Sequence, residues 1–358
     1  RGARTQTAAG MSADPTNDRK IQHIAIINED RDTDRRKHYF DAIRLTHRAL
    51  PECALDEIDP SVTFLGKRLS FPLLISCMTG GSHELVRTIN RRLAEAAEAE
   101  QVAMGVGSQR VLFTTPEARD SFALRPLAPT AVLLGNLGAV QLNEGFGIAE
   151  ARAAVDALGA DALVLHLNPL QEAVQPEGDT NFTGLAEKIG LVARALAPCP
   201  IIVKEVGAGI SAADARLLVA NGIEYIDVAG SGGTSWSRIE HHRHEGGGDD
   251  LGLLFQDWGL PTPLALHQLK PLRHQFTLIA SGGVRDGIDM AKSVILGASL
   301  CGLASPFLKP AMQSVDEVRR VIRRLRREFT TAMFLLGTPT ITDLFGHEDL
   351  IISSPWTT

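Results

Sequence analysis

The sequence alternates regularly between short apolar runs and longer segments with helical spacing, starting near residue 70. Eight such runs recur along the chain: Leu73–Cys77, Val102–Val106, Ala131–Asn136, Ala162–Leu167, Ile201–Lys204, Ile223–Val228, Phe276–Ala280 and Ser299–Leu303. Short runs without polar alternation are typical of strands buried on both faces, as in a parallel sheet. The segments between them, such as Val86–Glu100, Ile148–Leu158 and Ala212–Asn221, carry apolar residues at a period near 3.6. This alternation predicts a (β/α)8 barrel, with a doubly wound open sheet as the alternative.

Other segments flank this repeat. Residues 1–18 are expected to be a leader without fixed structure, 19–71 an N-terminal capping segment, 72–340 the barrel, and 341–358 a C-terminal tail. Turn and strand signals at Asp56–Phe71 place that stretch at the barrel bottom or flank. Arg238–Leu266, after the sixth strand, is long, polar and Gly-rich, so we expect a long loop there whose histidines lie in a solvated lid. The last helix is predicted at Val315–Leu336, with its arginines on the wet face.

Charge and cysteine usage narrow the possible partners. The net charge of −6 argues against nucleic acid or an anionic membrane as a partner, so a polyanionic ligand would require a local concentration of positive charge. The four cysteines, Cys53, Cys77, Cys199 and Cys301, form no CxxC pair and are expected to be reduced thiols of a cytoplasmic protein. No signal peptide and no apolar run of about 20 residues is present.

Glycine loops follow the last two predicted strands, at the mouth where barrels bind ligands. The first contains Gly282 and Gly283, and the second contains Ala304 and Ser305. Glycine allows close approach to a phosphate, and a following helix offers free N–H groups, although tight turns without a ligand remain the alternative. The fifth strand ends in Lys204, which could neutralise the electron-rich edge of a reduced flavin, or could form a salt bridge with Glu205.

The end of the fourth strand carries a polar cluster of His166, Asn168, Gln171 and Glu172. Glu172 is a hard oxygen ligand suited to Mg2+ shared with phosphates, whereas Gln171 can orient a ligand but cannot titrate. Helix capping is the alternative for Asn168 and Glu172. Other strand ends also offer side chains that could meet a ligand: Cys77, Met78, Thr79, Ser108, Gln109, Arg110, Asn136, Thr234, Trp236 and Glu240. Core packing is the alternative for Trp236, and a surface helix position is the alternative for Glu240.

In motif order the chain resembles the type 2 isopentenyl-diphosphate isomerase family, over about residues 19 to 336. The matching motifs are Arg19-Lys20-Ile21-Gln22-His23, Met78-Thr79-Gly80-Gly81, Gly105–Arg110, His166-Leu167-Asn168 with Gln171-Glu172, Val203-Lys204-Glu205, Gly232-Gly233-Thr234 with Trp236, and Ser281-Gly282-Gly283. Cys77 stands where the family is expected to have a small residue, and the His-rich stretch is not a family motif.

The resemblance implies a role for each matching residue. Those implied around a substrate diphosphate are Arg19, Lys20, His23, Ser108, Gln109, Arg110, His166 and Asn168. Those implied beside an FMN ring or ribityl chain are Cys77, Met78, Thr79, Ser108, Asn136, Lys204 and Thr234, and those implied at its phosphate are Gly282, Gly283, Ala304 and Ser305. Glu172 is implied to hold Mg2+, and Gln171, Trp236 and Glu240 are implied at the reacting end.

The implied reaction is the 1,3-allylic proton shift between isopentenyl and dimethylallyl diphosphate on reduced FMN, with NADPH or another donor as reductant. The resemblance also implies a homotetramer or larger assembly. We expect Arg19–His23 to be mobile without substrate and to close over the diphosphate. One alternative function is that of a 2-hydroxy-acid oxidase, but that chemistry requires a histidine base near the seventh strand. A nucleotide dehydrogenase would want a cysteine in the sixth loop. A non-catalytic flavin-binding barrel is the remaining rival.

Overall fold

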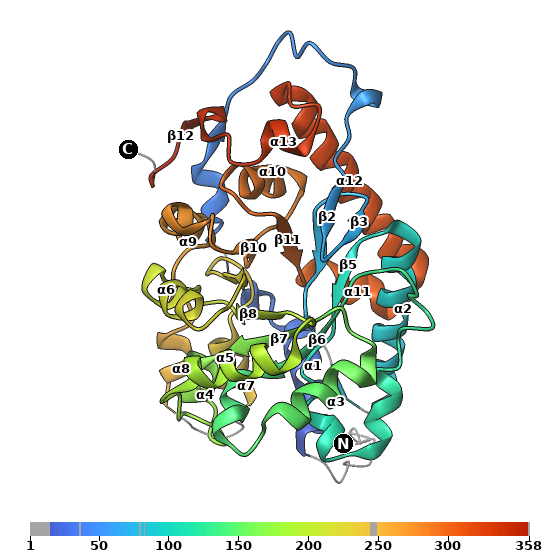
Figure 1. Cartoon of the computed structure of the whole chain (residues 1–358), viewed down its shortest axis with the longest axis vertical. Coiled ribbons are helices and arrows are strands. Elements are labelled where there is room, and N and C mark those ends of the chain that lie inside the picture. Colours follow the sequence, from blue (N-terminus) through green and yellow to red (C-terminus); the bar gives the residue numbers. More distant parts are fainter. Residues whose placement is uncertain (1–14, 36, 79, 82, 244–248, 357–358) are drawn as a thin grey trace, which may run out of the picture.

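The computed structural model describes residues 15–35, 37–78, 80–81, 83–243 and 249–356. Its centre is a closed barrel of eight parallel strands in the order β10-β11-β4-β5-β6-β7-β8-β9 (Figure 1). The strands are β4 (Leu73–Ile75), β5 (Ala103–Gly105), β6 (Leu133–Gly138), β7 (Ala162–Leu167), β8 (Ile201–Glu205), β9 (Tyr225–Asp227), β10 (Thr277–Ser281) and β11 (Leu300–Leu303). Each coincides with a predicted apolar run, so the barrel is confirmed and the open sheet is wrong.

Helices cover the outside of the barrel (Figure 1). They include α2 (Glu84–Glu100), α3 (Ile148–Leu158), α4 (Pro169–Val174), α5 (Leu185–Leu196), α6 (Ala212–Ala220), α9 (Thr262–Leu269), α10 (Gly287–Ile295), α11 (Ser305–Gln313) and α12 (Val315–Leu336). The predicted bounds of α3 and α12 are confirmed. Helix α12 begins with Ser314 accepting a hydrogen bond from the Glu317 N–H and ends at Gly337 in the left-handed conformation, so both ends are capped.

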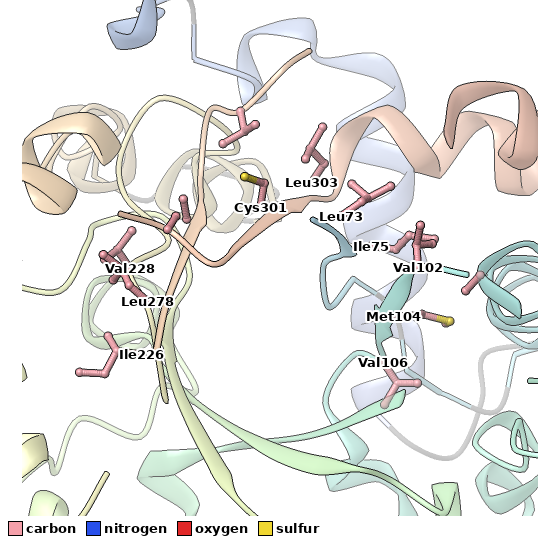
Figure 2. Packing of buried hydrophobic residues seen from close by; sticks show 14 of the residues in the cluster. Leu73, Ile75, Val102, Met104, Val106, Ile226, Val228, Leu278, Cys301 and Leu303 are labelled. Carbon is pink, nitrogen blue, oxygen red and sulfur yellow. The ribbon is translucent and has the colours of Figure 1, made fainter. Parts of the chain in front are cut away.

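The two faces of each strand pack into different layers. Leu73 and Ile75 of β4 point toward the helices (Figure 2), whereas Leu74 between them belongs to a smaller cluster inside the barrel. That inner cluster also takes one or two side chains from most other strands and is closed by Phe64 and Leu69. Burial on both faces explains why the strand sequences are continuously apolar.

A hairpin closes the bottom of the barrel. It consists of β2 (Val62–Phe64) and β3 (Lys67–Leu69), paired antiparallel. Lys67 forms an ion pair of 2.7 Å with Asp161, directly before β7 begins, which fixes the hairpin at the amino ends of the strands. The expectation that Asp56–Phe71 occupies this end of the barrel is therefore confirmed.

The N-terminal segment begins with α1 (Pro15–Glu29), so ordered helix starts four residues before the expected boundary at residue 19. Proline is common at the first position of a helix, because the N–H that it lacks has no hydrogen-bond partner within the helix there. Pro15 is therefore a suitable first residue for α1. Further along, β1 (Arg44–Leu45) pairs antiparallel with β12 (Ile351–Ser353), so the C-terminal tail is joined to the N-terminal segment. The expected leader, apart from residues 15–18, lies outside the described residues.

The long connection after β9 is partly helical rather than an open loop throughout. It contains α7 (Trp236–Arg243) and α8 (Leu251–Leu254) before α9 begins. The buried residues of α7 are Ser237, Ile239 and Glu240, so this helix lacks the apolar stripe by which helices are recognised in sequence. His242 is exposed, as expected for a solvated segment, and its Nε2 lies 2.9 Å from Asp30 Oδ2; residues 244–248 lie outside the described part. Among the described helices, none is long and apolar enough to cross a membrane.

Candidate active site

Two adjoining pockets open where the barrel strands end. The β7 pocket lies at the ends of β4 to β8, and the β10 pocket lies at the ends of β8 to β11. The predicted residues that line the β7 pocket are Arg19, Lys20, Cys77, Met78, Ser108, Arg110, Asn136, His166, Asn168, Gln171, Glu172, Lys204 and Trp236. Those that line the β10 pocket are Lys204, Thr234, Trp236, Gly282, Gly283, Ala304 and Ser305. Most of the predicted site residues thus meet at one end of the barrel; Thr79 lies outside the described residues, and His23 lines a third pocket together with Lys20, Met78 and Trp236.

Gln109 does not reach either pocket, so its assignment to the substrate is corrected. Its side chain is fully buried, donates to the carbonyl of Ala154 at 2.9 Å and accepts from the backbone N–H of Asn136 at 2.9 Å. It therefore fixes the end of β6, where Asn136 faces the β7 pocket. The sequence motif placed Gln109 near the site but could not say which way its side chain points.

The β10 pocket contains a glycine cradle suited to a phosphate. Gly282 and Gly283 have φ of +89° and +75°. A Cβ on Gly282 would overlap the carbonyl of Gly230, and a Cβ on Gly283 would overlap Gly232, because the loops after β9 and β10 touch backbone to backbone. The N-terminus of α11, at Ser305, also faces this pocket. Its free N–H groups and dipole favour an anion, so the residues fit an FMN phosphate better than they fit plain tight turns.

Lys204 stands where the two pockets join. Its Nζ donates to the backbone carbonyl of Glu205 at 2.8 Å and lies 3.7 Å from Oδ2 of buried Asp227. The Glu205 carboxylate instead accepts the N–H groups of Val206, Gly207 and Ala208, so the expected alternative of a Lys204–Glu205 salt bridge is wrong. The lysine is held as a single positive charge that could face a flavin ring from the barrel centre.

His166 and Asn136 form a pair at the ends of β7 and β6. The distance from His166 Nδ1 to Asn136 Oδ1 is 2.7 Å. Burial, together with the charges of Lys20 and Lys204, lowers the pKa of His166 to about 3, so the ring is neutral. With Nδ1–H donating to the amide oxygen, Nε2 is an acceptor. His166 lies in the expected pocket, but it could donate to a diphosphate only after taking up a proton.

Glu172 is buried at the start of α4 and is held by three donors. Its carboxylate accepts from Asn168 Nδ2 at 2.7 Å, from Gln175 Nε2 at 2.6 Å and from the N–H of Asp179 at 2.8 Å. Asn168 is at the N-cap position of α4 but makes no side-chain capping bond, so capping does not account for this pair. Burial raises the pKa of Glu172. No cluster of three or more His, Cys, Asp or Glu ligands exists in the described part of the chain. A Mg2+ ion here would therefore rely on Glu172, water and ligand phosphates, a set that Mg2+ commonly uses.

Helix α1 brings basic groups over the β7 pocket. Burial and the charge of Arg19 lower the pKa of Lys20 to about 8. The Arg19 Nε is buried and has no hydrogen-bond partner among the described residues. Arg19 and Lys20 of this helix line the β7 pocket together with Arg110 and Lys204. Positive charge is thus concentrated in one pocket, although the net charge of the chain is −6. This is the local concentration that a polyanionic ligand requires.

Trp236 and Glu240 of α7 differ in position. Trp236 lines both pockets and packs edge-on against His23, with ring centroids 5.2 Å apart, so it is a pocket wall and not a core residue. Glu240 is fully buried and lines neither pocket, so both its assignment to the reacting end and the surface alternative are corrected. Glu240 reaches the β7 pocket through Gln171, at 2.7 Å, and it also contacts His23, at 3.1 Å.

Sequence reasoning missed several residues at this mouth. Asp179 accepts from Arg110 and from Gln141, at 3.3 and 2.9 Å, and so fixes one wall of the β7 pocket. Arg35 is buried and donates to the carbonyls of Gly207 and Gln256, at 2.8 and 2.7 Å, joining loops that follow β8 and β9. An isolated arginine or aspartate in a polar segment gives no periodic or motif signal that could have revealed these contacts.

Comparisons with known proteins agree with this geometry. The family model described as FMN-dependent dehydrogenase matches residues 16–113 and 187–351. Among solved structures, the flavin-binding domain of baker's yeast flavocytochrome b2 superposes with a TM-score of 0.64 at 18% identity, covering 93% of this chain and 79% of that one. A mandelate oxidase with an FMN adduct superposes with a TM-score of 0.59 at 18% sequence identity, covering 95% of this chain and 92% of that one. The fold and site thus define an FMN-dependent barrel of the dehydrogenase type.

More similar relatives narrow the family. The isopentenyl-diphosphate delta-isomerase of Paracoccus zeaxanthinifaciens is 57% identical, covering 93% of this chain and 96% of the relative. The enzyme of the same name from Hydrogenovibrio crunogenus is 54% identical, covering 96% of this chain and 100% of the relative. The one from Thermococcus kodakarensis is 44% identical, covering 85% of this chain and 83% of the relative. The chain belongs to the isopentenyl-diphosphate delta-isomerase family.

Proposed function

We propose that this chain interconverts isopentenyl and dimethylallyl diphosphate by a 1,3-allylic proton shift, with FMN in the β10 pocket and the diphosphate in the β7 pocket. The observation that carries the proposal is that the two pockets adjoin and share Lys204, Val206 and Trp236. A flavin whose phosphate lies in the glycine cradle could therefore extend its ring to the cationic pocket. Close placement of two reactants in one site is the main source of rate when little titratable chemistry is available.

The roles of the β7 pocket residues follow from their charges. Lys20, Arg19 and Arg110 supply the positive charge for the diphosphate, and Ser108 and Asn168 add neutral polar contacts. Glu172 would hold Mg2+ against the same phosphates. His166, which is neutral, would donate only if the arriving anion raised its pKa. This set fixes one end of the substrate and leaves its hydrocarbon end to be placed by other residues.

The hydrocarbon end would lie beside Gln171 and Trp236. Reduced FMN, when bound, supplies the proton-transferring group and an electron-rich face for the positive charge that forms on protonating an alkene. Gln171 cannot titrate, so it orients the substrate, and Trp236 walls the site. Lys204 holds a positive charge at the junction of the pockets. Asn136 and Thr234 would contact the flavin, and Cys77 remains a thiol because burial raises its pKa to about 11.

The oxidase rival is less supported. Its members superpose on this fold, but likeness below 20% identity concerns the fold only. The sequence at the end of β10 is Ser281-Gly282-Gly283, which lacks the histidine base that 2-hydroxy-acid oxidation requires. A non-catalytic flavin-binding barrel would be a yellow protein that converts no substrate even when reduced. NADPH as the reductant and a tetrameric or larger assembly belong to the proposal.

We expect the purified protein to carry non-covalent FMN and to isomerise substrate only after the flavin is reduced. The reason is that a flavin held by the glycine cradle and Lys204 would have its ring next to the substrate carbons. The measurement is an isomerase assay in which FMN, Mg2+ and the reductant are omitted in turn. Full turnover with oxidised flavin, or with none, would contradict the proposed function.

We expect Glu172→Gln to lower activity mainly by weakening Mg2+ binding. The change removes one ligand charge while keeping the side-chain shape, so raised Mg2+ should restore part of the rate. The measurement is the activity of each protein across a Mg2+ titration, with the thermal midpoint as a check on folding. A mutant with the parent's Mg2+ requirement would show that Glu172 serves only to hold the start of α4.

A further inference from the structure

The buried carboxylate of Glu240 is the centre of a side-chain cluster behind the β7 pocket. Its Oε1 accepts from His23 Nε2 at 3.1 Å and from Gln171 Nε2 at 2.7 Å. Its Oε2 accepts a hydrogen bond from Nη1 of Arg243, one turn further along α7, and the two side chains form an ion pair. Arg243 lines neither pocket, and its side chain is only 13% exposed. The cluster therefore links a group outside the pocket to two residues assigned to it.

Arg243 is the cation in contact with this carboxylate. Burial raises the pKa of Glu240, but the hydrogen bond and the charge of His23, followed by the hydrogen bond from Gln171 and then by the Arg243 charge, lower it to about 2. Burial lowers the pKa of His23 to about 4, so at neutral pH that ring donates a hydrogen bond without carrying a charge. Lys20 of α1 and Glu172 of α4 also face the cluster, with opposite charges. The adjacent guanidinium is the permanently charged cation that bonds Glu240, and Lys20 is a second, titratable cation near it.

The charge state of Glu240 determines how two pocket side chains are oriented. An ionised carboxylate only accepts hydrogen bonds, so Gln171 must turn its NH2 group toward it. The Gln171 oxygen then accepts from Asn168 Nδ2 at 3.2 Å. For the same reason the neutral His23 must carry its proton on Nε2, which leaves the buried Nδ1 as an acceptor without a partner among the described residues. A protonated Glu240 would donate, and both arrangements could reverse.

We propose that Arg243 is a positioning residue that keeps Glu240 ionised and thereby sets the amide orientation of Gln171 and the tautomer of His23. This inference rests on the proposed function. Arg243 also donates to Glu177 Oε1 at 2.8 Å and lies 3.4 Å from Gln22 Oε1, so a purely mechanical role in joining α7 to the loop after α4 is the competing explanation. The two explanations differ in what a neutral residue does to the pH dependence.

The test is the pH profile of kcat, from about pH 5 to 9, for the reduced holoenzyme and its variants. In Arg243→Met the depressed pKa of Glu240 rises, so activity is lost at low pH and returns as the pH increases. We expect the acid limb of the kcat profile to move to higher pH, by about one pH unit for each unit by which the pKa of Glu240 rises. Arg243→Lys keeps the charge and should keep the parent profile. Glu177→Gln breaks only the mechanical link and should also keep the parent profile.

A second readout does not require activity. In protein labelled with 15N-histidine, the His23 signals, assigned with His23→Gln, should show an Nε2–H tautomer in the parent and a pH-dependent change in Arg243→Met. If Arg243→Met does not fold, Arg243→Gln replaces it, since it keeps a donor and removes only the charge. An unchanged pH profile and tautomer in the neutral variant, or equal losses in Glu177→Gln, would overturn the inference. A parent without isomerase activity would contradict the proposed function, while the tautomer would still report on Arg243.

Discussion

Gly282→Ala is expected to weaken FMN binding by roughly a hundredfold or more. Gly282 has φ of +89°, and a Cβ there would overlap the carbonyl oxygen of Gly230. The loops after β9 and β10 would have to separate, and the cradle for the phosphate would be lost. The measurement is a titration of the flavin-free protein with FMN, in which binding is monitored by the quenching of flavin fluorescence.

A matched control separates the backbone strain from the cradle. Gly145 has φ of +93°, but a Cβ there meets nothing within 4 Å. Gly145→Ala therefore carries the cost of a left-handed alanine without changing the β10 pocket, and it should bind FMN like the parent. Parental FMN affinity in Gly282→Ala, or equal weakening in both variants, would show that close loop contact is not what holds the phosphate.

Lys20→Ala is expected to raise the apparent substrate constant by roughly tenfold or more, because a charge-assisted contact contributes about 1.5 to 3 kcal/mol. The lysine is carried over the β7 pocket by α1, and FMN affinity should not change, since the phosphate cradle lies in the β10 pocket. The apparent constant and the FMN affinity of this variant are the two measurements. Equal substrate constants for mutant and parent would remove α1 from the substrate site.

The lowered pKa of Lys20 makes the same prediction in a second form. Because the pKa of Lys20 is about 8, the ammonium is lost as the pH rises through 8, and kcat/KM should fall there. Lys20→Arg remains charged and should remove this fall. Hydrogen exchange of residues 19–29 with and without substrate would test whether the helix closes over the diphosphate. The helix is ordered and packed in the structure described here, so the expected mobility stays a prediction.

Much of the fold could be read from the sequence because its signals are local. A strand buried on both faces must be apolar throughout, and a covering helix must repeat at 3.6 residues, so the eight strands and helices such as α3 and α12 followed from spacing. A barrel places all carboxyl ends of its strands at one mouth. Residues at those ends, such as Lys204 and His166, could therefore be assigned to one site before their contacts were known.

Local signals failed where a side chain's partner comes from a distant element. Gln109 lies shortly after β5, yet its side chain turns away from the mouth and donates to the carbonyl of Ala154 on α3. Helix α7 was read as part of a loop because it buries Glu240, a residue that normally marks a wet face. That burial is possible only because Arg243, His23 and Gln171 surround the carboxylate.

The sequence by itself determined which elements form and which residues gather at the mouth of the barrel, because hydrophobic period and strand ends are properties of neighbouring residues. Only the tertiary structure decided which of those side chains face the pockets and which support them from behind. His23 and Glu240 are 217 positions apart, and their hydrogen bond joins α1 to α7. A contact of that kind depends on how the chain returns to itself, and no local pattern encodes it.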